Sequence, residues 1–171
     1  MPERTTIVLA MHGSPPTDFP REELVEFFGI HFRLEHVSQS ISKQERARHD
    51  DLERRIRSWP RTSENDPYWN ASQVLAQELS NEIGLEVVVG FNEFCEPSID
   101  GSIEAAIESG SGKVTVVTPM MTKGGEHSEV DIPEAIERIQ ERYPEARIIY
   151  AWPYEVSEVA KFLAEQIQKL S

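Results

Sequence analysis

Two histidines in this sequence each follow a short apolar run of the kind that forms a buried strand. His12 comes directly after residues 5–11 (TTIVLAM), and His127 lies in the loop segment that follows residues 113–118 (KVTVVT). Imidazole nitrogens bind Fe2+, Co2+, Ni2+ and Zn2+, and a neutral histidine near pH 7 can also accept a proton. The two residues are therefore candidates for metal binding and for proton transfer.

A carboxylate from a third segment would complete such a metal site. Glu93 and Glu96 both follow another apolar run, residues 85–91 (LEVVVGF). Either one is a candidate acidic ligand, and either one could instead cap the helix expected to begin near Ser98. A lone histidine after a strand is more often a hydrogen-bonded loop residue than a ligand. The metal-site hypothesis therefore depends on the three segments coming together.

The strands and helices expected around these three segments indicate that the segments lie close together. The three runs above and a fourth, residues 147–152 (RIIYAW), predict four strands that are buried on both faces. Amphipathic patterns between and after the strands predict helices, and Asp131 followed by Glu134 predicts a capping box at the start of one of them. Alternating strands and helices form right-handed βαβ units. We therefore expect an α/β three-layer sandwich with a four-stranded parallel sheet, a flavodoxin-like half-lobe.

Ligands of open parallel sheets bind beyond the carboxyl ends of the strands. Because parallel strands all end at the same edge, His12, His127 and Glu93 or Glu96 are expected to meet there. Two imidazoles and one carboxylate form a suitable ligand set for a divalent transition metal.

Length, charge and cysteine content narrow the class of protein. The 171 residues fit a single domain, 1–171, and the net charge of −13 argues against a nucleic-acid partner. No stretch approaches the roughly 18 apolar residues of a membrane span, and the first residues lack the apolar run of a secretory signal. The single cysteine, Cys95, has no partner for a disulfide. We expect a soluble cytoplasmic protein.

An unusually long segment, residues 15–70, separates the first strand from the next regular helix pattern. It predicts a helix near residues 21–28, a charged helix near 43–59 and a turn-rich link over 61–70; loops of this length are usually functional or mobile. Its histidines, His31, His36 and His49, are expected to be surface or packing residues. Its aromatic residues either form a lip over a flat ligand or pack the segment onto the sheet; these are Phe19, Phe27, Phe28, Phe32, Trp59, Tyr68 and Trp69.

Three strings carry a resemblance to a known family. They are His12-Gly13-Ser14, Glu93 with Glu96-Pro97-Ser98-Ile99, and Gly125-Glu126-His127 continuing to Asp131-Ile132-Pro133. Together they resemble the small CbiX/SirB sirohydrochlorin chelatases, which are class II tetrapyrrole chelatases. The resemblance covers the first 14 residues and those from about 85 onward.

The resemblance implies a lyase-class enzyme that inserts Co2+ or Fe2+, or alternatively Ni2+, into a tetrapyrrole such as sirohydrochlorin, in siroheme or cobalamin biosynthesis. It implies metal contact and catalysis through His12 and His127, with an acidic partner that we place on Glu93. Expected substrate contacts are Ser14, Lys123, Gly124 and Gly125. The metal is a substrate, and no organic cofactor is implied. A homodimer is expected to supply the second wall of the substrate cleft.

Two departures from the family pattern keep other interpretations open. Pro15 stands where family members usually carry Arg after His-Gly-Ser, so Lys123 and the basic stretch 43–61 would have to bind substrate carboxylates. The segment 15–70 is instead similar in layout to the N-terminal half of protoporphyrin ferrochelatases. The alternatives are a ferrochelatase-type enzyme for a less carboxylated porphyrin, a binding protein that carries metal or tetrapyrrole without turnover, and a generic flavodoxin-like domain.

Overall fold

The structure, a computed structural model, describes residues 4–36 and 41–170, and within the first helix the side chains of Glu35 and His36 lie outside the described part. Its sheet consists of β1 (Thr5–Met11), β2 (Glu86–Phe91), β3 (Lys113–Val117) and β4 (Arg147–Tyr150). The strands are parallel and lie in the order β2-β1-β3-β4. The predicted parallel α/β fold is thus confirmed.

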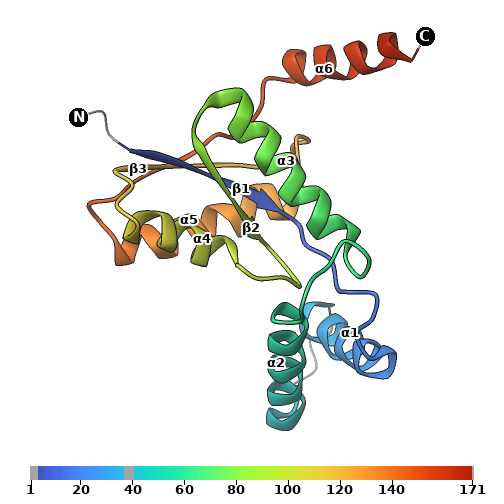
Figure 1. The fold of residues 1–171 in the computed structure, drawn as a ribbon. Coiled ribbons are helices and arrows are strands. Elements are labelled where there is room, and N and C mark those ends of the chain that lie inside the picture. Colours follow the sequence, from blue (N-terminus) through green and yellow to red (C-terminus); the bar gives the residue numbers. More distant parts are fainter. Residues whose placement is uncertain (1–3, 37–40, 171) are drawn as a thin grey trace.

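Helices cover the two faces of the sheet unequally. On one face, α4 (Ile99–Glu108) and α5 (Ile132–Arg142) bury side chains such as Val8 and Val116. On the other face, α3 (Pro67–Ile83) packs over β1 and β2, where Leu9 and Val89 are buried. Figure 1 shows α4 and α5 lying together, with α3 crossing the sheet separately. The successive side chains of β1 and β2 therefore enter two different cores.

Two further helices form a pair beyond the end of the sheet. α1 (Arg21–His36) and α2 (Lys43–Arg57) pack against each other around a small core of their own. Its buried members are Phe19, Phe27, Leu52 and Ile56. The segment 15–70 is therefore a helical subunit of the domain rather than a long loop.

The predicted boundaries in this segment need two corrections. The first helix does not stop near Phe28 but continues to His36. The predicted link over 61–70 is shorter, because α3 already begins at Pro67, where Asp66 accepts a hydrogen bond from the Trp69 amide at 2.8 Å. An aspartate followed by proline is a common helix start, and the turn-rich composition of the link concealed it.

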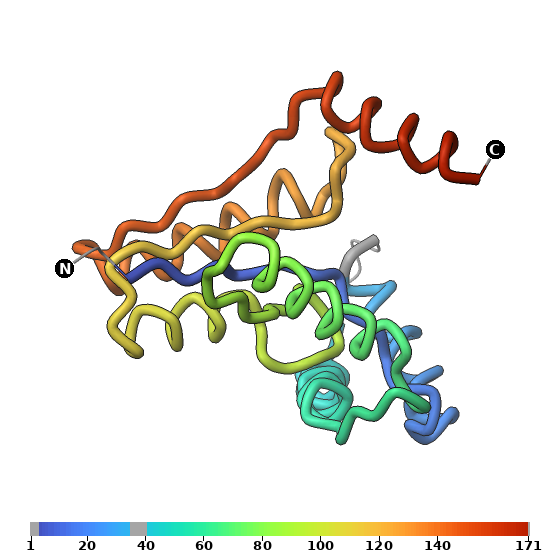
Figure 2. The backbone as a smooth tube through the Cα atoms, turned by 45° about the horizontal axis from the view of Figure 1, so that its top comes forward, coloured from blue at the N-terminus to red at the C-terminus, as the bar shows by residue number. Residues whose placement is uncertain are grey.

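The last helix, α6 (Val156–Lys169), forms where the sequence predicts it but buries none of its residues. Figure 2 shows it lying apart from the sheet at the end of the chain. None of the helices in the described ranges 4–36 and 41–170 is both long enough and apolar enough to cross a membrane.

Candidate metal centre

The structure brings together the three residues that the sequence singles out. His12, Glu93 and His127 each offer a ligand atom, and these atoms lie within 4.8 Å of one another. Nε2 of His12 is 3.8 Å from Oε2 of Glu93, and the two imidazole rings meet edge to face with centroids 4.5 Å apart. All three side chains are partly exposed. Two imidazoles and one carboxylate at this spacing can hold a divalent metal that remains open to a ligand.

Close contact between two loops places His12 beside Glu93. The Glu93 amide donates to the His12 carbonyl at 2.8 Å, so the chain after β1 stays paired with the chain after β2. Gly13 makes this approach possible: its φ is +100°, and a Cβ added there would lie 1.9 Å from the Glu93 carbonyl oxygen. Only glycine fits this position without displacing the loop.

A hydrogen bond at Nδ1 fixes the orientation of His12. Nδ1 lies 2.8 Å from the Gly13 carbonyl oxygen, which can only accept a hydrogen bond. Nδ1 therefore carries the proton, and the lone pair of a neutral His12 is on Nε2, the atom that faces Glu93.

His127 is held in a comparable way from a single π-helical turn, His127–Asp131, that leads into α5. Its Nδ1 lies 2.6 Å from Oδ2 of Asp131 and 2.6 Å from the side-chain amide nitrogen of Asn92, which itself donates to that Asp131 oxygen at 2.9 Å. A carboxylate that accepts the Nδ1 proton leaves Nε2 available to a metal and strengthens it as a ligand. Asp131 and Asn92 are positioning residues that the sequence analysis missed, although the four-residue spacing of His127 and Asp131 was a signal for the first.

The predicted capping box at Asp131 is wrong. Asp131 has helical backbone angles, and its side chain accepts no hydrogen bond from a backbone amide of the helix start. The π-helical turn has already begun the helix at His127, so Asp131 lies inside the helical segment and its carboxylate binds the imidazole instead.

The two candidate carboxylates occupy different environments. Glu96 is exposed, and its Oε2 accepts a hydrogen bond from the Ser98 amide at 2.9 Å, immediately before α4. Ser98 itself caps α4 by accepting from the Gly101 amide. Glu93 takes part in neither contact and faces His12. The geometry therefore favours Glu93 as the acidic member of the metal group.

Two arginines from the segment 15–70 hold the loop that carries Glu93. Arg57 donates to the Asn92 carbonyl at 3.0 Å, and Arg61 donates to the Phe94 carbonyl. The Arg61 side chain is almost fully buried and lies 3.3 Å from the equally buried carboxylate of Asp66. Arg57 and Arg61, which belong to the basic stretch 43–61, thus bind the loop that carries Glu93. The sequence pattern did not indicate this role.

Cys95 lies in the same loop but is not a member of the metal group. The side chain is buried, and burial raises the pKa of the Cys95 thiol above its usual value. A metal is bound by the thiolate, so a thiol that is held protonated is a poor ligand.

A cavity of about 290 Å3 adjoins the metal group. Glu93, Asn92 and Asp131 line it on the sheet side, whereas Phe27 and Arg57 line it on the side of α1 and α2. The helical pair therefore forms one wall of the space beside the metal group.

A row of aromatic rings runs from His12 toward α1. The Phe94 ring lies 6.3 Å from the His12 ring and 5.8 Å from the Phe28 ring, and Phe28 and Phe32 are 40% and 59% exposed. Phe27 is only 1% exposed, so it belongs to the core and not to a lip. Of the predicted lip residues, Phe28, Phe32 and Tyr68 are exposed, the last at 38%, and Phe28 is the one that contacts the Phe94 ring.

The predicted substrate contacts lie in the loops after β1 and β3. None of them belongs to the metal group itself. Ser14 is partly buried after β1, whereas Lys123, Gly124 and Gly125 are exposed after β3. The Gly124 amide donates to Oε1 of Glu129 at 2.9 Å, and its φ of +87° favours glycine. The loop is therefore structured by its own contacts, and Lys123 extends from it into solvent.

Comparisons with known proteins agree with this architecture. The CbiX family model matches residues 63–170, a range that includes Glu93 and His127. The sirohydrochlorin ferrochelatase of Priestia megaterium is 35% identical over 82 residues, which cover 47% of this chain and 30% of that protein. The sirohydrochlorin cobaltochelatase of Methanopyrus kandleri is 42% identical over 50 residues, 29% of this chain and 34% of that protein. The matches thus span about a third of the curated relatives.

Two solved structures share the fold. A putative cobalamin biosynthesis CbiX protein from Marinobacter aquaeolei VT8 has a TM-score of 0.55 at 17% identity, with 96% of this chain and 95% of that chain covered. SirB from Bacillus subtilis with Fe3+ has a TM-score of 0.52 at 20% identity, with 98% of this chain and 48% of that chain covered. At these identities the likeness establishes the fold alone. The family model, in contrast, spans more than half of the sequence, and this chain therefore belongs to the CbiX family.

Proposed function

We propose that this protein is a lyase-class metal chelatase that inserts Co2+ or Fe2+ into a tetrapyrrole, with sirohydrochlorin as the ring. The observation that carries the proposal is the meeting of His12, Glu93 and His127 at the carboxyl edge of the sheet. Membership of the CbiX family and the activities named for the relatives from Priestia megaterium and Methanopyrus kandleri support the same reaction and the same ring.

The reaction exchanges two protons for one metal ion, so the site needs bases as well as metal ligands. In our proposal Nε2 of His12 and Nε2 of His127 bind the incoming cation loosely, because only three protein ligands surround it. As the ring nitrogens displace these ligands, the two pyrrole protons pass to the imidazoles and to Glu93, and then to solvent. Neutral imidazole suits both tasks near pH 7.

The tetrapyrrole would lie over the metal group with its flat face against the aromatic row. Phe94 and Phe28 extend apolar surface away from His12, which suits stacking on a macrocycle. We assign Ser14 and the loop residues Lys123, Gly124 and Gly125 to contacts with the ring periphery. Lys123 is free to reach a ring carboxylate because it is exposed. Binding energy from the periphery can then be used to distort the ring toward its metal-accepting shape.

A less carboxylated porphyrin is the second candidate ring. The observation that favours it is the exposed aromatic pair Phe28 and Phe32, which offers an apolar contact area, while Pro15 removes one expected basic contact. Insertion rates measured with sirohydrochlorin, coproporphyrin and protoporphyrin, each with Co2+ and Fe2+, separate the two candidates. We expect sirohydrochlorin with Co2+ or Fe2+ to react fastest, and a higher rate with protoporphyrin would contradict that choice.

Turnover separates an enzyme from a carrier. With ring and metal in large excess over protein, a chelatase forms many equivalents of metallated ring, whereas a binding protein forms one at most. The metallated ring has its own visible spectrum, so its formation can be followed continuously. A yield that stops at one equivalent would overturn the proposal of catalysis and leave a metal- or tetrapyrrole-binding protein.

We further propose that the chain acts in the cytoplasm as one domain, residues 1–171, and as a homodimer. One lobe provides one wall of a substrate cleft, and the SirB structure matches this chain over only 48% of its own length. A second copy related by a twofold axis would supply the opposite wall. The lone, buried Cys95 suits a reducing compartment.

A further inference from the structure

The π-helical turn that carries His127 leaves one carbonyl without a helical donor. In such a turn an amide bonds to the carbonyl five residues before it, and the Ile132 amide donates to the His127 carbonyl in this way. The next carbonyl, that of Ser128, would receive the amide of residue 133, but that residue is Pro133, which has no N–H. In the α-helical register the donor would be the Ile132 amide, which is already bonded to His127. The turn therefore cannot satisfy the Ser128 carbonyl from its own backbone.

Burial makes an unpaired carbonyl costly at this position. Ser128 is only 1% exposed, so water cannot replace the missing amide. The Ser128 hydroxyl is already engaged, because it donates to the Gly125 carbonyl at 3.1 Å. The donor for the Ser128 carbonyl must therefore come from another element of the fold.

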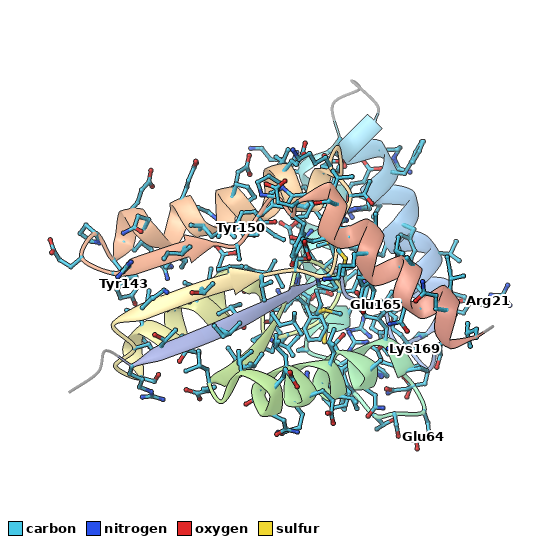
Figure 3. All side chains as sticks on the ribbon, turned by 90° about the horizontal axis from the view of Figure 1, so that it is seen from above. Arg21, Glu64, Tyr143, Tyr150, Glu165 and Lys169 are labelled. Carbon is cyan, nitrogen blue, oxygen red and sulfur yellow. The ribbon has the colours of Figure 1, made fainter. Side chains whose placement is uncertain are left out.

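Tyr150, the last residue of β4, supplies this donor. Its hydroxyl donates to the Ser128 carbonyl at 2.9 Å. Burial raises the pKa of the Tyr150 hydroxyl well above its usual value, so the group stays protonated and remains a donor. The ring packs against the core that contains Ile132 and Ala135, and Figure 3 shows Tyr150 between β4 and α5. The hydroxyl is thus held in place by a strand on one side and a helix on the other.

The Tyr150–Ser128 hydrogen bond bears directly on His127, the residue that precedes Ser128. If the turn tightened to the α-helical register, the Ile132 amide would leave the His127 carbonyl and bond to the Ser128 carbonyl instead. Each residue of an α-helix is rotated by about 100° from the next, so a turn with one residue fewer changes the direction of the side chains before it. The His127 imidazole would then turn away from the metal group.

We infer that Tyr150 is a positioning residue for metal binding. Its hydroxyl replaces the amide that Pro133 lacks, and it thereby keeps the wide turn that directs His127 toward the metal group. The inference rests on the proposed metal-binding role of His127. It extends the site to β4, a strand that supplies none of the three ligands of the metal group.

The test compares Tyr150→Phe with a matched control, Tyr154→Phe. The Tyr154 hydroxyl also donates to a backbone carbonyl, that of Thr118 at 2.6 Å, but this carbonyl lies outside the π-helical turn. Each substitution removes one hydroxyl and keeps the ring, so both proteins should fold. Tyr150→Phe should raise the Kd for Co2+ by about 10-fold or more, as is typical when a residue that orients a metal ligand is changed. Tyr154→Phe should bind Co2+ like the wild type.

The same two substitutions in a Pro133→Ala background test the pairing of Tyr150 with Pro133. An amide at residue 133, or the Ile132 amide once the proline ring is gone, can bond to the Ser128 carbonyl and make the Tyr150 hydroxyl dispensable. Tyr150→Phe should therefore lower the midpoint of urea unfolding in the wild-type background and change it little in the Pro133→Ala background. Tyr154→Phe should lower the midpoint equally in both.

Three results would overturn the inference and leave the metal-binding role of His127 intact. They are a wild-type Kd for Co2+ in Tyr150→Phe, an equal loss of Co2+ affinity in Tyr154→Phe, and a fall of the urea midpoint on Tyr150→Phe that is the same in both backgrounds. If the wild type and His127→Ala bound Co2+ equally, the proposed role of His127 would fail, and the inference would fail with it.

Discussion

Two regions of this molecule each bring a pair of histidines together, and they differ in what the nitrogen atoms face. At the carboxyl edge of the sheet, the His12 and His127 rings meet edge to face, and each turns its Nδ1 to a protein oxygen. Between α1 and α2, the His31 and His49 rings are nearly parallel, and Nδ1 of His31 lies 3.0 Å from Nε2 of His49.

The surroundings of His31 and His49 indicate that these two histidines are packing residues. Both of its rings stack on the buried Phe27, and His49 is itself 7% exposed. One of the two facing nitrogens donates to the other, and Nδ1 of His49 lies 3.3 Å from Oδ1 of Asp50, so both nitrogens of His49 are already engaged within the protein. In the part of the chain that the structure describes, the edge of the sheet is where histidine and carboxylate form a group of three close donors. The difference shows that a histidine pair becomes a candidate metal site only when its unprotonated nitrogens and a carboxylate converge.

The largest effect is expected from His127→Ala. Removal of this imidazole should lower the rate of metal insertion by about 1,000-fold or more, because it removes a ligand and a proton acceptor together. The fold should persist, since His127 is partly exposed in a loop-derived turn. His12→Ala should behave alike, and the double variant should lose little more than either single one if the residues act as a unit. Initial rates of insertion and circular dichroism check these outcomes. Wild-type turnover in His127→Ala would show that the site is assigned wrongly.

Asp131→Asn tests how His127 is positioned. The substitution replaces the carboxylate acceptor of the Nδ1 proton, and second-layer changes of this kind typically cost about 10- to 100-fold in metal affinity or activity. We expect the KM for metal to rise together with a fall in kcat, while the KM for the ring stays constant. If a folded Asp131→Asn protein kept the wild-type KM for metal and the wild-type kcat, Asp131 would have only a structural role.

Substitutions of Glu93 and Glu96 should have different effects on turnover. Glu93→Gln should lower turnover by about 10-fold or more, since it removes a ligand charge and a proton acceptor, with little effect on ring binding. Glu96→Gln should change turnover little and instead weaken the start of α4, where Glu96 accepts from the Ser98 amide. The reverse ranking of the two turnover rates would transfer the acidic role to Glu96.

Substitutions of the exposed Phe28 and the buried Phe27 in α1 should also differ, the first in ring affinity and the second in the free energy of unfolding. Phe28→Ala should raise the Kd for the ring by about 3- to 10-fold, because one stacking contact contributes roughly 0.5 to 1.5 kcal/mol. Phe27→Ala should instead lower the free energy of unfolding by about 3 to 5 kcal/mol, as for other buried aromatics. Porphyrin titrations and urea denaturation of both variants are the matched measurements. Equal ring affinity in Phe28→Ala and wild type would sink the idea that α1 forms a lip.

The smallest effect on activity is expected from His49→Ala. Loss of a buried ring stacked on Phe27 should reduce the free energy of unfolding by about 1 to 3 kcal/mol. The rate of metal insertion per folded molecule should stay at the wild-type value. A large loss of insertion with an intact fold would break the distinction between the two histidine pairs.

The part of the site that follows from strand order was predictable, and the part that follows from loop contacts was not. Apolar runs identified the strands, and parallel order then placed His12, Glu93 and His127 at one edge. The clamping of the Glu93 loop by Arg57 and Arg61 depends on contacts between residues more than 30 positions apart. Nothing in local composition indicates such contacts.

Two side chains could not be placed from the sequence for the same reason. The composition of the segment leaves lip and packing open for both Phe27 and Phe28, whereas the packing of α1 on α2 turns Phe27 inward and leaves Phe28 exposed. Asp131 matched a capping pattern, but a π-helical turn places it beside His127. In both cases a shift of one residue or one turn along a helix decided which face a side chain occupies.

The most direct test of the account is a Co2+ titration followed by visible absorption, in which protein-bound cobalt shows ligand-field bands. The wild-type protein and His49→Ala should each bind one Co2+ per chain at the sheet edge with the same spectrum. His12→Ala and His127→Ala should lose that spectrum or bind far more weakly. An unchanged cobalt spectrum in both edge variants, or its loss in His49→Ala, would contradict the claim that His12, Glu93 and His127 hold the substrate metal.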